Sequence, residues 1–357
     1  MKHSVIVLCQ TTLVPLFLPQ IRSPDNDGQG IRGVNMNYST QRLAADNDGI
    51  KTAATLLRAG QLVAFPTETV YGLGADARNS HAVTNIFAAK QRPHFNPLIV
   101  HLPDLAAVES IAELPDSARA LAAAFWPGPL TLVLKRRPDC GLSDLVTAGL
   151  DTVAVRIPEH PLARRLLTEF GGPVAAPSAN PSGKISPTTA DHVLEGLSGK
   201  VAAVLDGGPC GVGLESTILG FTNSHPILLR TGGIPVEAIE SALGQKIAKD
   251  EGENITAPGQ LKSHYAPSAT MRLDATAPES DEVWLGFGPD SVETPALNLS
   301  PNGDLHEAAA NLFAHMRALD KIAKSEGLHK IAVAVIPHHG LGAAINDRLE
   351  RAAAPRA

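Results

Sequence analysis

From residue 50 onward, short apolar runs alternate with amphipathic stretches, a pattern typical of strands and helices that pack on each other. Apolar residues at helical spacing predict a helix over 50–57, and the apolar run 62–65, stopped by Pro66, predicts a buried strand. The same criteria predict helices over 82–90, 117–125, 161–170, 189–197 and 235–243, and strands over 98–100, 130–134, 153–157, 174–176, 201–205, 217–221 and 227–229. Because α/β alternation is mixed with strand–strand steps, we expect one twisted mixed sheet with packed helices.

A second α/β pattern follows a polar stretch, 245–270, which contains Pro258, Gly259 and Pro267 and is typical of a linker. Strands are then predicted over 282–287 and 331–336, and helices over 306–324 and 343–353. The expected domains are an N-terminal extension (1–45), a large domain (46–244), the linker (245–270) and a small α/β domain (271–357).

The composition is that of a globular protein, with 44% hydrophobic, 18% charged and only 4% aromatic residues. The net charge is −6, and residues 51–243 carry 15 Lys and Arg against 17 Asp and Glu, a net of −2. Stable nucleic-acid binding through bulk charge is therefore not expected, and any anion site must be a local cluster of cations.

Three cysteines, Cys9, Cys140 and Cys210, lack the CxxC spacing of a structural zinc site, and their odd, sparse number argues against a disulfide framework. No run reaches the roughly 18 apolar residues that a transmembrane helix requires, so no membrane association is expected. These features favour a cytoplasmic protein.

The common catalytic signatures, GxxxxGK[ST], GxGxxG, HExxH and GxSxG, are absent from the sequence. Polar residues instead follow the predicted strands, beginning with Thr67 and Glu68 after the strand 62–65. Such residues point into the ligand crevice of α/β sheets. A turn whose hydroxyls bind local backbone groups explains them equally well.

Cations and hydroxyls follow in the same way. Lys90 and Arg92 end a predicted helix, where they either cap it or bind phosphate together with His94. The loop APSANPSGK, 176–184, supplies hydroxyls, an amide and a lysine to an anion. Arg156 lies within an apolar strand and Arg230 ends another, so each forms a structural ion pair or binds an anionic ligand. This set favours chemistry by positioning and charge neutralisation, as in nucleotidyl transfer.

The motifs PTETVYGLG, KQRPHFNPLIVH, WPGPLTLVL, VAVRIPEHP, APSANPSG, GLESTI and ILLRTGG occur in this order. Together with the HYAP sequence of the linker and the C-terminal GLGAAINDRLERAA, they resemble the YrdC family of threonylcarbamoyl-AMP synthases, in its two-domain form. The resemblance implies a YrdC-like twisted mixed sheet with packed helices and a small C-terminal Rossmann-like α/β domain.

The resemblance also implies a reaction. Threonylcarbamoyl-AMP and pyrophosphate form from L-threonine, bicarbonate or CO2, and ATP, and a partner tRNA threonylcarbamoyltransferase uses the product to modify adenosine 37 of tRNA. Mg²⁺ is expected with ATP, held mostly through phosphates and water. No metal site made of protein side chains is assigned, with Glu68 suggested only as a helper.

The site residues implied by the resemblance form two groups. The threonine pocket falls on Thr67, His101, Arg156, Ser178 and Ser216. The ATP contacts fall on Lys90, Arg92, His94, Asn180, Thr188, Arg230 and Tyr265, with Lys90 and Arg92 as the catalytic cations. The linker is expected to fold over the site, although Ser263 stands where the family has an arginine.

Two other classes of protein remain in view. An RNA-binding module is disfavoured by the charge balance and by the lack of a run of aromatic residues. A carbamoyl-transfer module of hydrogenase maturation is disfavoured because its zinc-finger-like cysteine motifs are missing.

The N-terminal extension yields a prediction. Residues 23–30 are rich in Pro, Gly, Asn and Asp, and the apolar pieces before them lack an A-x-A cleavage pattern. We expect that residues 1–35 are a disordered tail or precede the true start near Met36. N-terminal sequencing of the native protein tests the second case, and a mature start before Met36 would contradict it.

Overall fold

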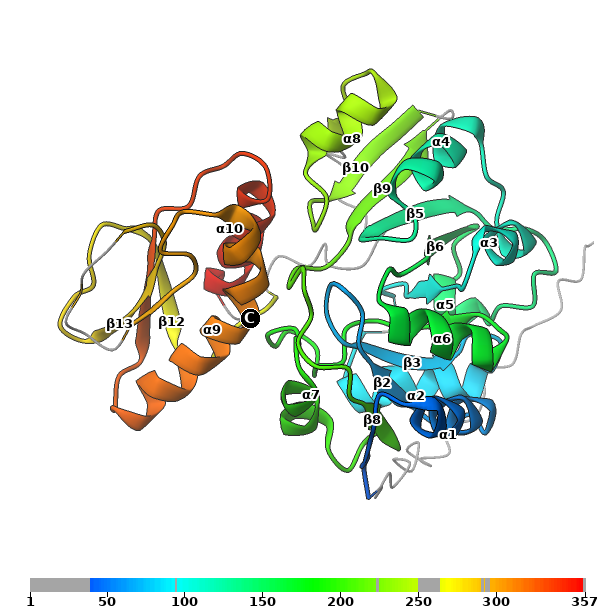
Figure 1. Cartoon of the computed structure of the whole chain (residues 1–357), viewed down its shortest axis with the longest axis horizontal. Coiled ribbons are helices and arrows are strands. Elements are labelled where there is room, and N and C mark those ends of the chain that lie inside the picture. The colour runs from blue at the N-terminus through cyan, green and yellow to red at the C-terminus, as the bar shows by residue number, and fades with distance from the viewer. Residues whose placement is uncertain are drawn as a thin grey trace, which may run out of the picture. The chain divides into compact units, whose positions relative to one another are not determined.

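The computed structural model of the protein describes residues 39–93, 95–222, 225–249, 264–289, 292 and 296–355. His94, residues 1–38 and most of the linker lie outside the described residues. Figure 1 shows the arrangement of the helices and strands.

A large mixed sheet forms the centre of the N-terminal domain. Its strands are β1 (Gln41–Leu43), β2 (Val63–Phe65), β3 (Gly72–Asp76), β4 (Ile99–His101), β5 (Leu130–Lys135), β6 (Thr152–Arg156), β7 (Val174–Ala175), β8 (Ala203–Leu205), β9 (Thr217–Thr222), β10 (His225–Arg230) and β11 (Ala248–Lys249). They lie in the order β1-β8-β2-β3-β7-β4-β6-β5-β9-β10-β11, with parallel and antiparallel neighbours. The prediction of a mixed sheet is confirmed.

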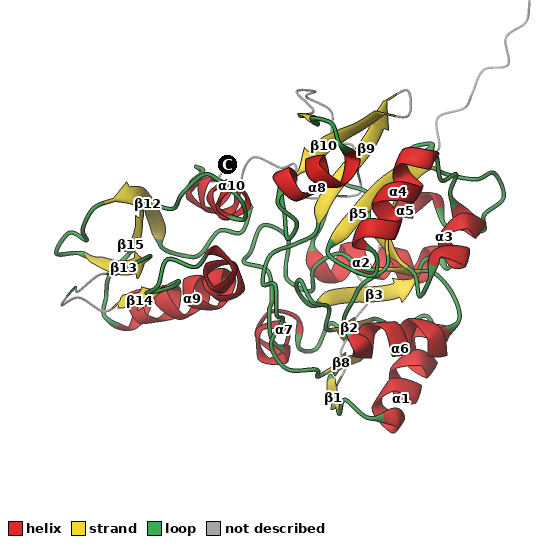
Figure 2. Ribbon diagram, turned by 45° about the horizontal axis from the view of Figure 1, so that its top comes forward, coloured by secondary structure: helices red, strands yellow, loops and turns green. Residues whose placement is uncertain are grey.

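Helices pack around this sheet. They are α1 (Asn47–Arg58), α2 (Ser80–Lys90), α3 (Leu105–Ile111), α4 (Asp116–Phe125), α5 (Asp144–Thr147), α6 (Pro161–Phe170), α7 (Ala190–Leu197) and α8 (Val236–Leu243). Helices α1 and α6 contact each other near β2 and β8, and α4 contacts α8 near β10, as Figure 2 shows. Within the described residues, no helix is long and apolar enough to cross a membrane.

The C-terminal domain is a smaller α/β unit, as the resemblance implies. Its elements are β12 (Thr270–Ala275), β13 (Glu282–Gly286), β14 (Ala296–Asn298), α9 (Leu305–Ser325), β15 (Lys330–Ala334) and α10 (Gly342–Ala353). The four strands are all parallel and lie in the order β12-β15-β13-β14. A parallel sheet of this kind needs helices on its faces, a role that α9 and α10 fill.

The hydrophobic core of the C-terminal domain extends into the N-terminal domain. Val70, Ile185 and Leu214 belong to the same buried cluster as Phe313 of α9 and Tyr265 of the linker. Because Val70 lies in the loop that follows β2, this shared core fixes the C-terminal domain against the polar loops at the strand ends.

Several strands were not predicted by the pattern of hydrophobic residues. The clearest case is β3, whose Gly72 and Gly74 give it little strand propensity. A Cβ on Gly74 would lie 2.9 Å from the ring of Phe65, so the packing requires glycine there. Strand β1 lies within the stretch 1–45 expected to be an extension, and it pairs with β8, so residues 41–43 belong to the large sheet.

Gly213 provides a test of the contact between the domains. Its φ is +73°, and a Cβ there would lie 2.5 Å from the carbonyl oxygen of Ala309 in α9. We expect Gly213→Ala to lower the free energy of unfolding by about 1 kcal/mol for the backbone, with roughly 1–3 kcal/mol added for overpacking. Urea denaturation measures the change.

Gly141→Ala is the matched control, because Gly141 has φ +74° with no atom within 4 Å of the added Cβ. It should show only the backbone cost. Equal losses in the two variants would mean that the loop does not press on α9 in solution.

Candidate functional site

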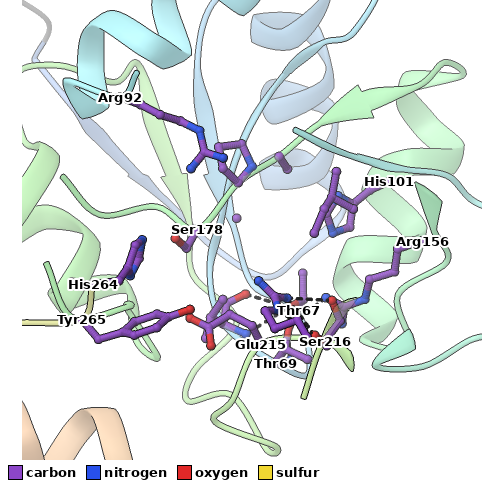
Figure 3. Close-up of a pocket in the computed structure, with 16 residues that line it drawn as sticks. Thr67, Thr69, Arg92, His101, Arg156, Ser178, Glu215, Ser216, His264 and Tyr265 are labelled. Carbon is purple, nitrogen blue, oxygen red and sulfur yellow. Dashed lines mark hydrogen bonds between the residues drawn. The ribbon is translucent and has the colours of Figure 1, made fainter. Parts of the chain in front are cut away.

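A small cavity of about 50 Å³ lies where the central strands of the large sheet end. Strand pairing assembles its walls. His101 of β4 and Arg156 of β6 are direct partners in a parallel pair, and Gly72 bridges to Ser178 after β7. Loops far apart in the sequence therefore meet at one point, as Figure 3 shows.

Most of the residues singled out from the sequence line this cavity. They are Thr67, Arg92, His101, Arg156, Ser178, Ser216, Arg230 and Tyr265. The structure adds polar residues that the sequence reasoning did not select, which are Thr69, Glu215 and His264. Lys90, Asn180 and Thr188 are not among the lining residues, and His94 is outside the described residues.

Arg156 forms a buried ion pair. Its Nη2 donates to Glu68 Oε1 at 2.5 Å, its Nη1 to Thr69 Oγ1 at 2.9 Å and its Nε to the Gly128 carbonyl at 3.2 Å. Arg156 is 3% exposed, and its guanidinium has five N–H donors, so donors remain for a ligand carboxylate in the cavity.

Glu68 acts as the counterion of Arg156. The sequence suggests Glu68 as a helper of a metal ion, but Oε1 accepts from Arg156 and Oε2 accepts from the backbone N–H of Glu159 at 3.1 Å. Both oxygens are thus engaged by protein donors. Within the described residues, no group of three or more His, Cys, Asp or Glu side chains is arranged to hold a metal ion.

Thr67 fits both interpretations of its loop. Its hydroxyl donates to the Val70 carbonyl at 2.7 Å, and the N–H groups of Thr69 and Val70 point to it at 3.2 Å, so it stabilises a tight turn. The same turn places Thr67 and Thr69 in the cavity wall. Thr69 then connects this turn to Arg156, a link that only the folded chain reveals.

Arg92 and Arg230 bring positive charge to the cavity. Arg92 donates through Nη2 to the Pro97 carbonyl at 2.9 Å, and Arg230 donates through Nη2 to the Ser216 carbonyl at 2.8 Å. Burial lowers the pKa of each guanidinium to about 10, and Tyr265 opposes this shift in both. Both side chains are therefore still cationic at neutral pH.

Lys90 is not among the residues that line the cavity. Its ammonium donates to the carbonyls of Ser178 and Asn180 at 2.5 Å each, and the side chain is 1% exposed. Burial, with Arg92 nearby, holds its pKa well below the usual value. Lys90 thus fixes the loop that carries Ser178.

Asn180 and Thr188 support the same region from outside the cavity. The Asn180 amide donates to the Pro181 and Lys184 carbonyls at 2.8 Å, which shapes the 180–184 loop. The Thr188 hydroxyl lies 3.4 Å from His192 Nδ1. In this arrangement both residues act on the shape of the site.

Glu215 and Ser216 form the opposite wall. The Ser216 hydroxyl is held by Thr131 Oγ1 at 2.7 Å and by Arg230 Nη2 at 3.2 Å. The loop containing Gly232 lies directly on this segment, because a Cβ on Gly232 would be 2.4 Å from the Glu215 carbonyl oxygen. Glu215 itself is 7% exposed, and it pairs with Arg348 of α10 at 2.9 Å.

The end of the linker closes the cavity from a further side. Tyr265 has φ +63°, is 1% exposed and stacks on Phe313 of α9 with ring centroids 5.4 Å apart. Figure 3 shows its ring extending toward Glu215 and Ser216. His264 packs against the Tyr265 ring at 4.1 Å. Tyr265 therefore lines the cavity, and its contact with the nucleotide stays a prediction.

His101 is a neutral group in the wall. Burial, aided by the charge of Arg156, lowers its pKa to about 3. Its Nδ1 has no hydrogen-bond partner among the described residues. A neutral imidazole with an unused nitrogen suits a polar ligand group rather than an anion.

Two protein families match the chain. The family described as "Telomere recombination" matches residues 55–232, and the one described as "Threonylcarbamoyl-AMP synthase, C-terminal domain" matches residues 234–354. The boundary between the two matches falls just before α8, the last helix of the large domain.

Similar proteins cover both domains. The threonylcarbamoyl-AMP synthase of Bacillus subtilis is 43% identical over 338 residues, which are 89% of this chain and 96% of that protein. The threonylcarbamoyl-AMP synthase of Pyrococcus abyssi is 40% identical over 86% of this chain and 94% of its own length. The crystal structure of P. abyssi Sua5 complexed with L-threonine superposes with a TM-score of 0.80 at 38% identity, covering 88% of this chain and 97% of that one.

The ion pair of Arg156 and Glu68 leads to a prediction about stability. Arg156→Met would leave a buried carboxylate without its partner, so we expect a loss of roughly 3–5 kcal/mol in the free energy of unfolding. Adding Glu68→Gln removes that charge and should restore most of the loss. Urea denaturation of both variants, with the exposed Arg137→Met as control, makes the comparison. A double variant no more stable than the single one would contradict the pairing.

Proposed function

The chain belongs to the family of threonylcarbamoyl-AMP synthases, and we propose that its cavity binds L-threonine beside ATP and joins them through a carbamate. The observation that carries this proposal is a buried cavity in which Arg156, Arg92 and Arg230 surround hydroxyl groups. Such a site offers cations for a carboxylate and for phosphates, and hydroxyls for an amino acid.

L-Threonine is assigned to the part of the cavity near Arg156. The remaining N–H donors of Arg156 suit the threonine carboxylate by bidentate contact. The hydroxyls of Ser178 and Ser216, the Thr67 turn and the neutral His101 suit its ammonium and hydroxyl groups. The complex of P. abyssi Sua5 with L-threonine supports this choice of ligand.

ATP is assigned to the part of the cavity between Arg92, Arg230 and Tyr265. Arg92 and Arg230 would neutralise the triphosphate, and Tyr265 would cover the nucleotide. Lys90, Asn180 and Thr188 would act by holding the loops in place, and their direct contact with ATP stays a prediction. His94 keeps its assignment to ATP as a prediction.

The reaction we propose balances without a protein nucleophile. Threonine ammonium and bicarbonate give the carbamate, with release of water and a proton. A carbamate oxygen then forms a bond to the α-phosphorus of ATP while the bond from that phosphorus to the β-phosphate oxygen breaks, and pyrophosphate leaves. Arg92 and Arg230 stabilise the negative charge that gathers on the leaving group.

Mg²⁺ is proposed to enter with the phosphates of ATP. The nearby carboxylates of Glu68 and Glu215 are each engaged by an arginine, so they are poorly placed to serve as its first ligands. Mg²⁺ bound through phosphates and water agrees with the usual preference of this ion.

The product is proposed to pass to a tRNA threonylcarbamoyltransferase that modifies adenosine 37, and the cytoplasm is the compartment in which we expect this exchange. The mixed anhydride of a carbamate and AMP hydrolyses readily, so enclosure of the cavity by the linker would protect it until transfer.

Substrate omission tests the proposal. Pyrophosphate release should require L-threonine, bicarbonate, ATP and Mg²⁺ together, and an AMP-linked product should appear in mass spectrometry only with all four. Arg92→Met should lower the rate by about 100-fold through loss of phosphate stabilisation, whereas the exposed Arg137→Met should not change it. An AMP-linked product formed without threonine would show that the substrate is wrong.

A further inference from the structure

Arg348 of the C-terminal domain reaches the wall of the cavity in the N-terminal domain. It lies in α10, is 0% exposed and donates through Nε to Glu215 Oε2 at 2.9 Å. Its Nη2 donates to the Thr231 carbonyl at 2.9 Å, and Asp347 accepts from its Nη1. Arg348 thereby joins residues that lie 117 and 133 positions away in the sequence.

Glu215 places a negative charge beside a cavity that is proposed to bind ATP. The two oxygens of its carboxylate accept from different donors: Oε1 accepts from Ser186 Oγ at 2.5 Å, and Oε2 accepts from Arg348. Burial alone would raise the pKa of Glu215, but Arg348 and Arg230 outweigh it and hold the pKa below the usual value. The carboxylate is therefore ionised, and without Arg348 it would repel a phosphate.

Arg348 also contacts the residue that covers the cavity. Its guanidinium lies 5.3 Å from the centroid of the Tyr265 ring, whose other contacts include the stack on Phe313. A cation over a tyrosine face stabilises the ring position. Arg348 thus neutralises Glu215 in the cavity wall and also fixes the position of the Tyr265 ring.

We propose that Arg348 is a positioning residue for the nucleotide: it neutralises Glu215 and seats Tyr265, so that the C-terminal domain forms part of the ATP site. The inference rests on the proposed function, since it assumes a phosphate ligand near Glu215. It assigns the C-terminal domain a role in nucleotide affinity beyond covering the active site.

Four full-length variants test this role by steady-state pyrophosphate release with ATP and threonine varied separately. Arg348→Met should raise KM for ATP about tenfold or more and leave KM for threonine within twofold. Glu215→Gln alone should not raise KM for ATP, because it removes a carboxylate from the cavity wall while Arg348 and its positive charge stay in place. Adding Glu215→Gln to Arg348→Met should recover most of the loss.

Lys321→Met is the matched control for domain docking. Lys321 of α9 pairs with Glu195 of α7 at 2.5 Å, so it also joins the two domains, but it is exposed and does not line the cavity. It should leave both KM values unchanged. Equal effects of Lys321→Met and Arg348→Met, or a double variant as impaired as Arg348→Met, would overturn the proposal.

Folding and the parent reaction are checked separately. Thermal unfolding identifies any variant that is not folded. If Arg348→Met is not folded, Arg348→Gln replaces it, because glutamine keeps a hydrogen-bond donor toward Glu215 without the charge. The expected KM values are the same. The unaltered protein decides the proposed function, because absence of threonine-dependent pyrophosphate release there would refute the reaction itself rather than the role of Arg348.

Discussion

The burial of positive charge is the constraint on which the rest of this structure depends. Lys90, Arg92, Arg156, Arg230 and Arg348 are each at most 9% exposed. A buried cation is costly unless its donors are satisfied, and here carbonyl oxygens of the loops satisfy many of them. The loops at the strand ends are therefore shaped by the cations they enclose. An anionic ligand of the kind proposed would add to this charge compensation at the cavity.

Two carboxylates set the distribution of this charge. Glu68 neutralises Arg156 on the side assigned to threonine, and Glu215 is neutralised by Arg348 on the side assigned to ATP. The first pair lies within the N-terminal domain, whereas the second joins the two domains. Removal of the C-terminal domain would thus affect both the shared hydrophobic core and the charge of the cavity wall. It would expose Val70 and Leu214 of the shared core and leave Glu215 as a lone buried charge at the cavity.

The sequence predicts the elements well where apolar periodicity is strong, as in β4, β5, β6 and α9, and poorly where packing overrides propensity, as in β3 with its glycines. Strand-end polarity led to Arg156 and Arg230, because an arginine beside an apolar run is a local signal. The resemblance led to His101, Ser216 and Tyr265, which also line the cavity. Glu215 and Arg348 were missed as a pair because 133 positions separate them and neither carries a local pattern. The hydrogen bonds of Lys90 to the carbonyls of Ser178 and Asn180 were likewise not predictable, since a helix-end lysine has the same local sequence whether it binds a ligand or a carbonyl.

The placement of Tyr265 shows why the linker and the C-terminal domain act together. Tyr265 has φ +63°, a backbone conformation that residues other than glycine rarely adopt. Its ring is fixed between Phe313 and Arg348, both from the C-terminal domain, so docking of that domain compensates the backbone cost. If the domain separates, the tyrosine loses both contacts and the strained conformation loses its support. Opening of the cavity and release of Tyr265 are therefore expected to occur as one event, which links access to the cavity to the ion pair of Arg348 and Glu215 in its wall.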